Sequence, residues 1–176
     1  MKYIFKISIF FLIFYHTLHA KTLSQYQIET LKMVKEIAQQ YPNDAGETFE
    51  KTLMAICLTE TNAGMARLGD HKSHYKDYTK SSLGIMQIQV PTARFVAKIY
   101  NLHEVSKLSD KKLSIELMEN DSLNIKLATL YIKWLNDRYY DYFTMISRYN
   151  GGMHNYKYFD KVIKNLEFIK KHYEFI

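Results

Sequence analysis

The chain is poor in the residues that interrupt or cross-link helices. Its 176 residues include one cysteine, two prolines and six glycines. The single cysteine, Cys57, excludes an intramolecular disulfide, and so few helix breakers leave room for long helices. No run of lysines and arginines marks a nucleic-acid site, although the formal net charge is +6. The sequence therefore predicts a nearly all-α domain that binds no nucleic acid, with Cys57 as a small core residue.

The first 20 residues have the pattern of a secretory signal peptide. Lys2 and Lys6 flank the start of an apolar stretch over 7–15, and Ala20 is a small residue at which a peptidase could cut. This stretch is short for a transmembrane helix, which needs about 20 apolar residues. We expect 21–176 to be one domain in the periplasm or outside the cell. An uncleaved inner-membrane anchor is the alternative.

Apolar residues recur at helical spacing along almost all of the remaining chain. This spacing predicts helices over residues 24–41, 47–61, 91–100, 111–119, 122–140, 142–149 and 159–173. Ser24 with Gln27, and Asp44 with Glu47, have the spacing of a capping box at the start of the first two helices. The polar segment 65–82 lacks the period, so we expect a long loop there. The pattern favours a single all-α domain.

Glu60 is the most informative residue, because it is a carboxylate on the apolar face of a predicted helix. The apolar side chains that share its stripe are Phe49, Leu53, Ile56 and Cys57. Burial disfavours the charged form of a carboxylic acid, so the pattern predicts a raised pKa and a proton held near neutral pH, as a general acid requires. The alternatives are that Glu60 turns to solvent, or that an arginine such as Arg67 or Arg94 neutralises it.

Three short motifs follow one another in a set order. They are Glu60-Thr61, the stretch 82–88 (Ser-Leu-Gly-Ile-Met-Gln-Ile) and the stretch 148–152 (Arg-Tyr-Asn-Gly-Gly). Together they resemble the motifs of the lytic transglycosylases with a soluble-lytic-transglycosylase (SLT) domain, in the goose-type-lysozyme-like superfamily. That family has a Glu-Ser pair, then Gly-Leu-Met-Gln, then Ala-Tyr-Asn-x-Gly. The similarity continues at 90–93 and 120–125, so it covers nearly all of the chain after the leader.

The resemblance implies a compact lysozyme-like domain with a substrate cleft in which Glu60 is the sole catalytic acid and base. The other residues that the motifs would place at this cleft are Thr61, Ser82, Gly84, Met86, Gln87, Tyr149 and Asn150. Such an enzyme cuts the β-1,4 bond between N-acetylmuramic acid and N-acetylglucosamine in peptidoglycan without water, leaving 1,6-anhydro ends.

The resemblance also implies how such an enzyme works in the cell. It implies no cofactor and a monomer that opens the cell wall locally. A secretion, conjugation or flagellar complex is the kind of partner that such an enzyme serves. The sequence alone does not distinguish these complexes, or cleavage within strands from cleavage at strand ends.

Three motif positions depart from the family pattern. Thr61 stands where the family has serine and keeps a hydroxyl, and Ile85 replaces leucine and keeps apolar bulk. Arg148 is the larger change, because it replaces alanine with a cation. We expect Arg148 either to pair with Glu60 or to point to solvent.

The long loop after Glu60 leaves two other functions open. His71 and His74 have a spacing that could bind a metal, but no further ligand supports such a site, so we expect none. If Asp70 or Asp77 orients a water in the cleft, the enzyme is a muramidase, a hydrolase with the same fold. The remaining alternative is a non-catalytic module that binds the wall or helps to assemble a complex.

Overall fold

The structure, a computed structural model, describes residues 22–69, 78–139 and 141–173. The expected signal peptide lies outside these residues, as do the four loop residues Asp70, His71, His74 and Asp77. Within the described part of the chain, eight α-helices and one short 3-10 helix form, and the strand-like pairing amounts to two isolated bridges. The predicted all-α class is confirmed.

The helix boundaries follow the predicted pattern with a few shifts. The elements are α2 Gln25–Ala38, α3 Glu50–Thr61, η1 Tyr78–Lys80, α4 Val90–Ile99, α5 His103–Ser106, α6 Asp110–Glu119, α7 Asp121–Arg138, α8 Tyr142–Tyr149 and α9 Tyr156–His172. The short helix α5 falls in a segment without a predicted helix. No helix among these described elements combines the length and apolar character that crossing a bilayer requires.

One of the two predicted capping boxes is confirmed and the other is wrong. Ser24 caps α2, and its reciprocal bonds with Gln27 are both present. Helix α3 instead begins at Glu50, after Phe49, which provides no side-chain cap. The reason is that the Asn43 side-chain oxygen accepts hydrogen bonds from the backbone N–H groups of Ala45 and Glu47 and closes a separate turn.

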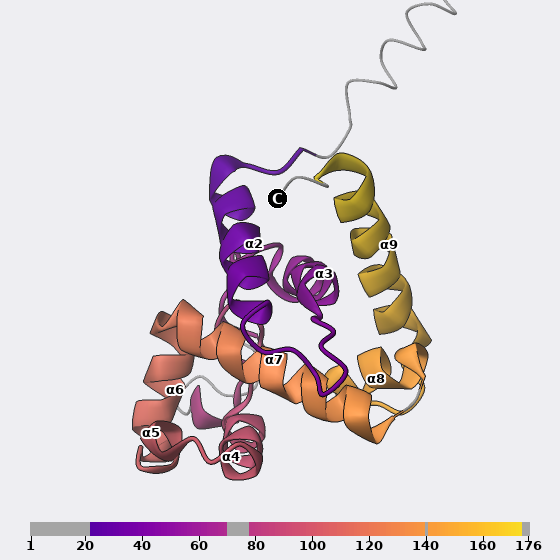
Figure 1. Ribbon diagram of the computed structural model, residues 1–176. Helices are drawn as coiled ribbons and strands as arrows, with labels where there is room; N and C mark the ends of the chain where they lie inside the picture. Colours follow the sequence, from indigo (N-terminus) through magenta and orange to yellow (C-terminus); the bar gives the residue numbers. More distant parts are fainter. Residues whose placement is uncertain (1–21, 70–77, 140, 174–176) are drawn as a thin grey trace, which may run out of the picture.

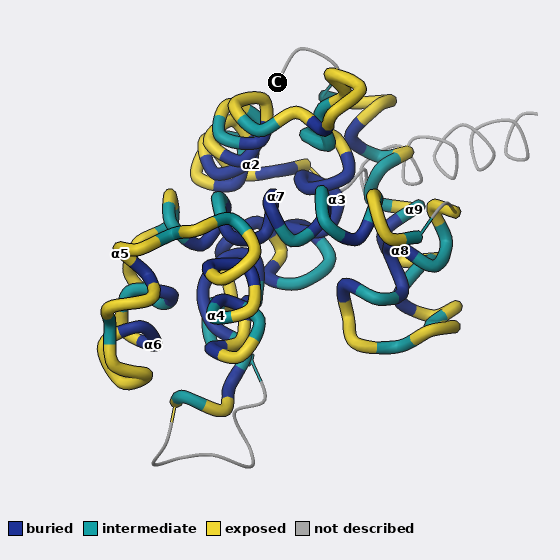
Figure 2. The backbone as a smooth tube through the Cα atoms, turned by 60° about the horizontal axis from the view of Figure 1, so that its bottom comes forward, coloured by how far each residue is buried: buried dark blue, intermediate teal, exposed yellow. Residues whose placement is uncertain are grey.

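Helix α3 is the central element of the fold. Residues 52–58 are all buried, so this helix is surrounded on every side, as expected for a helix that is apolar all round. Figure 1 shows it nearly end-on, with α2 and α9 packed on either side. Cys57 is fully buried in this core, as predicted. Figure 2 shows the buried positions gathered on the inner sides of the helices.

Three further helices form a second group, while α8 packs against α7 and α9. Helices α4, α5 and α6 lie together beside α7, which runs between them and the helices around α3 (Figure 1). A surface depression lies where the two groups meet, and Glu60 at the end of α3 is among the residues that line it.

Candidate active site

A cleft of about 340 Å³ lies between the two groups of helices. Its lining comes from the end of α3, the segment 81–89, the helices α4, α7 and α8, and the turn after α8. The residues that line it are Glu60, Ser82, Gln87, Ile88, Gln89, Thr92, Tyr131, Tyr149, Asn150 and Gly151. Among these described lining residues Glu60 is the one carboxylate. The segment 81–89 is called the cleft loop below.

Glu60 lies in the last turn of α3 and is half-buried. The hydroxyl of Tyr158, on α9, donates a hydrogen bond to Glu60 Oε1 at 2.6 Å. Burial and the nearby carboxylate of Glu60 raise the pKa of Tyr158 well above its ordinary value. The phenol therefore keeps its proton and acts as a fixed donor that orients one oxygen of Glu60.

Tyr149 is the second tyrosine beside Glu60. Its side chain lines the cleft, and its hydroxyl donates to the backbone oxygen of Met86 at 2.8 Å. Burial raises its pKa well above the ordinary value, and the negative charge of Glu60 raises it further. Tyr149 therefore joins α8 to the cleft loop while it presents its ring to the cleft.

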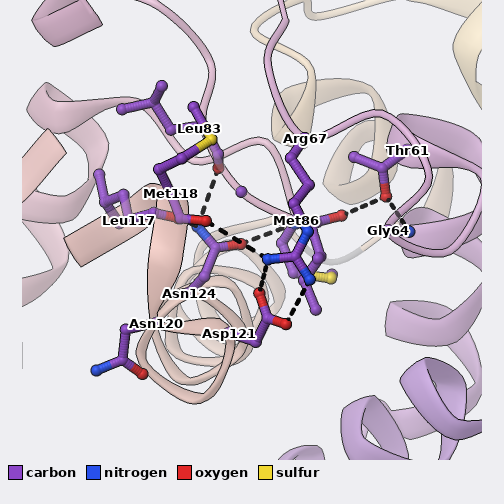
Figure 3. Close-up of polar contacts among 12 residues, drawn as sticks. Thr61, Gly64, Arg67, Leu83, Met86, Leu117, Met118, Asn120, Asp121 and Asn124 are labelled. Carbon is purple, nitrogen blue, oxygen red and sulfur yellow. Dashed lines mark hydrogen bonds and ion pairs between the residues drawn. The ribbon is translucent and has the colours of Figure 1, made fainter. Parts of the chain in front are cut away.

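The cleft loop has a shape that the sequence motif allows and that a buried side chain holds. Gly84 has a positive φ of 73°, a conformation that favours glycine. Asn124, which is fully buried in α7, donates to the backbone oxygens of Leu83 and Leu117, and its side-chain oxygen accepts from the N–H of Met86 (Figure 3). One amide side chain thus satisfies three backbone groups that burial would otherwise leave unpaired.

Thr61 holds the other side of this loop. Its hydroxyl donates to the backbone oxygen of Ile85 at 2.8 Å and accepts from the N–H of Gly64 at 2.8 Å. The residue is 1% exposed, so it does not reach the cleft surface. A serine hydroxyl at this position could make the same bonds.

The side chain of Gln87 lines the cleft, and its amide nitrogen is hydrogen-bonded within the protein. Its Nε2 donates to the backbone oxygens of Arg67 at 3.0 Å and of Gly84 at 2.8 Å. Both amide hydrogens are therefore used to fix the orientation of the side chain. The group that this orientation can offer to a ligand is its oxygen, which accepts hydrogen bonds.

The three arginines considered as partners of Glu60 have other contacts. Arg67 forms a bidentate pair with Asp121 at 2.7 Å for each bond, which raises the pKa of Arg67 (Figure 3). Arg94 pairs with Asp110 at 2.8 Å. The guanidinium of Arg148 lies over the ring of Tyr139, 5.3 Å from its centroid.

The structure separates the predicted site residues into two sets. Five of them line the cleft, namely Glu60, Ser82, Gln87, Tyr149 and Asn150. The other three, Thr61, Gly84 and Met86, are buried behind its wall. The Thr61 hydroxyl and the backbone of Gly84 and Met86 help to shape the cleft loop, and none of the three residues is among those that line the cleft.

Sequence reasoning missed Tyr158, which contacts Glu60 directly. A signal for it exists, because Tyr158 is four residues before Val162 and both are buried on α9. The helix predicted over 159–173 begins one residue after Tyr158, so that prediction left Tyr158 out. Helical spacing could thus have placed Tyr158 in the interior, although it could not have named its partner.

Acidic and metal-binding side chains are sparse around the cleft. Across the described ranges, no three side chains of histidine, cysteine, aspartate or glutamate lie close enough together to hold a metal ion. The chemistry that this part of the chain offers is therefore a single carboxylate with a tyrosine donor, in a cleft lined by polar and aromatic groups.

Comparison with known proteins gives one match. A family model described as the transglycosylase SLT domain matches residues 36–169. The match extends over most of the chain and includes the cleft with both of its walls. No curated protein sequence and no solved structure matches the chain.

Proposed function

The chain belongs to the transglycosylase SLT domain family, and from this premise we propose that it is a lytic transglycosylase with Glu60 as its acid and base. Membership of this family indicates activity on peptidoglycan in general. The proposal adds the bond that is cut, the product and the residue responsible. The bond is the β-1,4 link from N-acetylmuramic acid to N-acetylglucosamine, and the product carries a 1,6-anhydro ring.

The observation that carries this proposal is the single carboxylate among the described residues of the cleft lining. Most glycosidases need two carboxylates, one to protonate the leaving oxygen and a second to act as nucleophile or to activate water. A substrate that supplies its own nucleophiles removes the need for the second. Muramoyl sugars have two such groups, the 2-acetamido oxygen and the C6 hydroxyl.

In the proposed first step, protonated Glu60 gives its proton to the glycosidic oxygen. The bond between this oxygen and C1 of the muramoyl sugar breaks, and N-acetylglucosamine leaves as an alcohol. Positive charge develops at C1, and the 2-acetamido oxygen of the same sugar traps it as a ring. Glu60 is now a carboxylate.

In the second step, the same carboxylate acts as a base. It takes the proton from the C6 hydroxyl of the muramoyl sugar while that oxygen attacks C1 and displaces the acetamido oxygen. The anhydro ring closes, Glu60 regains its proton, and no water is consumed. One group can serve both steps because the first step leaves it in the form that the second requires.

The neighbours of Glu60 support this cycle in distinct ways. Tyr158 holds one carboxyl oxygen by a hydrogen bond, which directs the other oxygen for proton transfer. Tyr149 offers an aromatic ring on which a sugar can stack. Gln87 and Asn150 offer polar groups to the N-acetyl substituents.

The product of the reaction tests this proposal. The purified protein is incubated with peptidoglycan, and the released muropeptides are measured by mass spectrometry beside those from Glu60→Gln. We expect 1,6-anhydro ends, lighter by one water than hydrolytic products, from the wild-type protein alone. Reducing ends would instead identify a muramidase and direct attention to Asp70 and Asp77. Wall binding without products from either protein would indicate the non-catalytic module.

We also propose that the enzyme acts outside the cytoplasm, where its polymer lies. The support is the signal-peptide pattern of residues 1–20. N-terminal sequencing of the exported protein should begin at Lys21. A product that retains Met1 would indicate the uncleaved anchor. A secretion, conjugation or flagellar complex stays a candidate partner that capture from the periplasm would identify.

A further inference from the structure

Four aromatic rings form a continuous series that leads away from the cleft. This series, called the aromatic file, consists of Tyr149, Tyr131, Trp134 and Phe95. The ring centroids of Tyr149 and Tyr131 are 5.8 Å apart, those of Tyr131 and Trp134 are 6.3 Å apart, and those of Trp134 and Phe95 are 4.7 Å apart. Tyr149 and Tyr131 line the cleft, whereas Trp134 and Phe95 are not among its lining residues.

The outer half of the file reaches the surface. Phe95 is 36% exposed, whereas Trp134 packs against the core cluster with part of its side chain. Its ring makes a T-shaped contact with Trp134, which is half-buried. An exposed phenylalanine that extends a row of cleft aromatics is a surface on which an apolar or amphipathic ligand can bind.

The middle of the file fits a linear sugar polymer. Tyr131 and Trp134 are one helical turn apart on α7, and their ring planes differ by 6°. Successive sugars in a β-1,4-linked strand also keep nearly parallel mean planes, and the apolar C–H face of a pyranose can stack on such rings. The ring of Phe95 stands at 81° to that of Trp134, so it can contact a sugar on Trp134 from the side.

We propose that Trp134 and Phe95 form a sugar-binding strip that holds the glycan strand where it continues beyond the cleft. The inference rests on the proposed function, because it takes the occupant to be the strand whose bond lies at Glu60. Continuity with the cleft supports this choice, since Thr92 lines the cleft from α4 and Phe95 lies on the next turn of the same helix. The strip favours long strands over short fragments.

The chain provides its own probe for this strip, because Trp134 is its only tryptophan. The protein with Glu60→Gln, which prevents turnover, is titrated with a hexamer of N-acetylglucosamine while tryptophan emission is recorded. Stacking replaces water on the indole, so we expect a saturable blue shift. Emission that does not change at any hexamer concentration would overturn the strip.

A pair of variants separates a strip from ordinary packing. In the same Glu60→Gln protein, Phe95→Ala should raise the Kd for the hexamer by roughly threefold to tenfold, the effect of losing one aromatic contact. The matched control is Ile115→Ala on α6, which removes another exposed apolar side chain (47% exposed) that is not among the residues lining the cleft. It should leave the Kd unchanged. Equal Kd values for Phe95→Ala and its parent would overturn the proposal.

The readouts also distinguish failure of the strip from failure of the proposed function. Muropeptide release by the wild-type protein tests the reaction alone. If anhydro products form but the hexamer leaves the Trp134 emission unchanged, the strip is wrong and the reaction stands. If the emission shifts but no product forms, the strip stands as a sugar-binding surface and the reaction is wrong.

Discussion

The two walls of the cleft differ in how their motif residues contribute. On the wall formed by α3 and α8, Glu60 and Tyr149 line the cleft, and Tyr158 bonds to Glu60 from α9 behind it. On the wall formed by the cleft loop, Ser82 and Gln87 line the cleft, whereas Gly84 and Met86 are buried and act through their backbone. The acid wall mainly presents groups, whereas the loop wall must also keep a shape.

This difference shows that, within one motif, some residues supply chemistry to the cleft and others maintain the backbone that holds them. A residue that presents chemistry can be replaced with little effect on folding, because its removal leaves the backbone in place. Replacing a residue that maintains a turn or pairs buried backbone groups lowers stability first, and it lowers activity as a consequence of the altered fold. The following variants test this division from the largest expected effect to the smallest.

Glu60→Gln should give the largest effect on turnover and a small effect on stability. Loss of the proton donor and acceptor should lower muropeptide release by a factor of roughly 100 to 10,000. The amide keeps an oxygen that can accept from Tyr158, so the free energy of unfolding should change by less than about 1 kcal/mol. Substantial turnover in this variant would contradict the assignment of Glu60.

Gly84→Ala should show the opposite pattern. A methyl group there would lie 2.2 Å from the backbone oxygen of Leu117 and 2.6 Å from Asn124 Nδ2, in addition to the strain of φ +73°. We expect a loss of roughly 3 to 5 kcal/mol in the free energy of unfolding, measured by urea denaturation. The matched control is Gly46→Ala, which has φ +82° and no atom within 4 Å, and should cost about 1 kcal/mol. Similar losses for both would show that the clash has no importance.

Tyr158→Phe tests whether one side chain behind the acid wall orients the catalytic carboxylate. The ring stays in place while the hydroxyl that donates to Glu60 at 2.6 Å is removed. A hydrogen bond to a charged group contributes roughly 1.5 to 3 kcal/mol, so we expect turnover to fall by about tenfold or more. Tyr173→Phe is the control, because its hydroxyl accepts from the N–H of Leu23 and lies outside the cleft lining. Equal activity of the two variants would exclude an orienting role for Tyr158.

Raising the pH above 10 should lower the free energy of unfolding through the two buried tyrosines, Tyr149 and Tyr158. The pKa values of Tyr149 and Tyr158 are raised well above the ordinary value of 10 by burial and by Glu60. The folded state therefore keeps protons that the unfolded state releases, so this stabilisation is fully present below pH 10 and is lost as the pH rises further. Between pH 8 and pH 10.5 we expect a loss of about 1 kcal/mol for each of the two tyrosines.

Urea unfolding at the two pH values measures this loss. Tyr158→Phe should lose less stability between them than the wild-type protein, because one of the two phenols is gone. The same loss in both proteins would mean that Tyr158 titrates as it does in the unfolded chain. The difference between the two proteins, about 1 kcal/mol, is the smallest of the four effects, because it arises from proton release by one phenol and leaves all packing in place.

The sequence determined the local features of this protein. Helical spacing, the Ser24 cap and the scarcity of glycine and proline follow from interactions within a few residues, and they predicted the all-α class and most helix boundaries. The order of the motifs around Glu60 and Gln87 indicated the family that residues 36–169 match. The predicted α3 cap at Asp44 was wrong, because the side chain of Asn43 accepts hydrogen bonds from the same backbone segment and closes a separate turn.

The tertiary structure alone decided which motif residues face the cleft and what each contacts. Tyr158 and Glu60 are 98 residues apart in the chain, and Asn124 reaches the cleft loop from α7. No periodicity connects such positions, because their distance depends on how whole helices pack. Burial depends on packing in the same way, so Thr61 and Gly84 can share motifs with Glu60 and Gln87 and still lie behind the surface that those residues form.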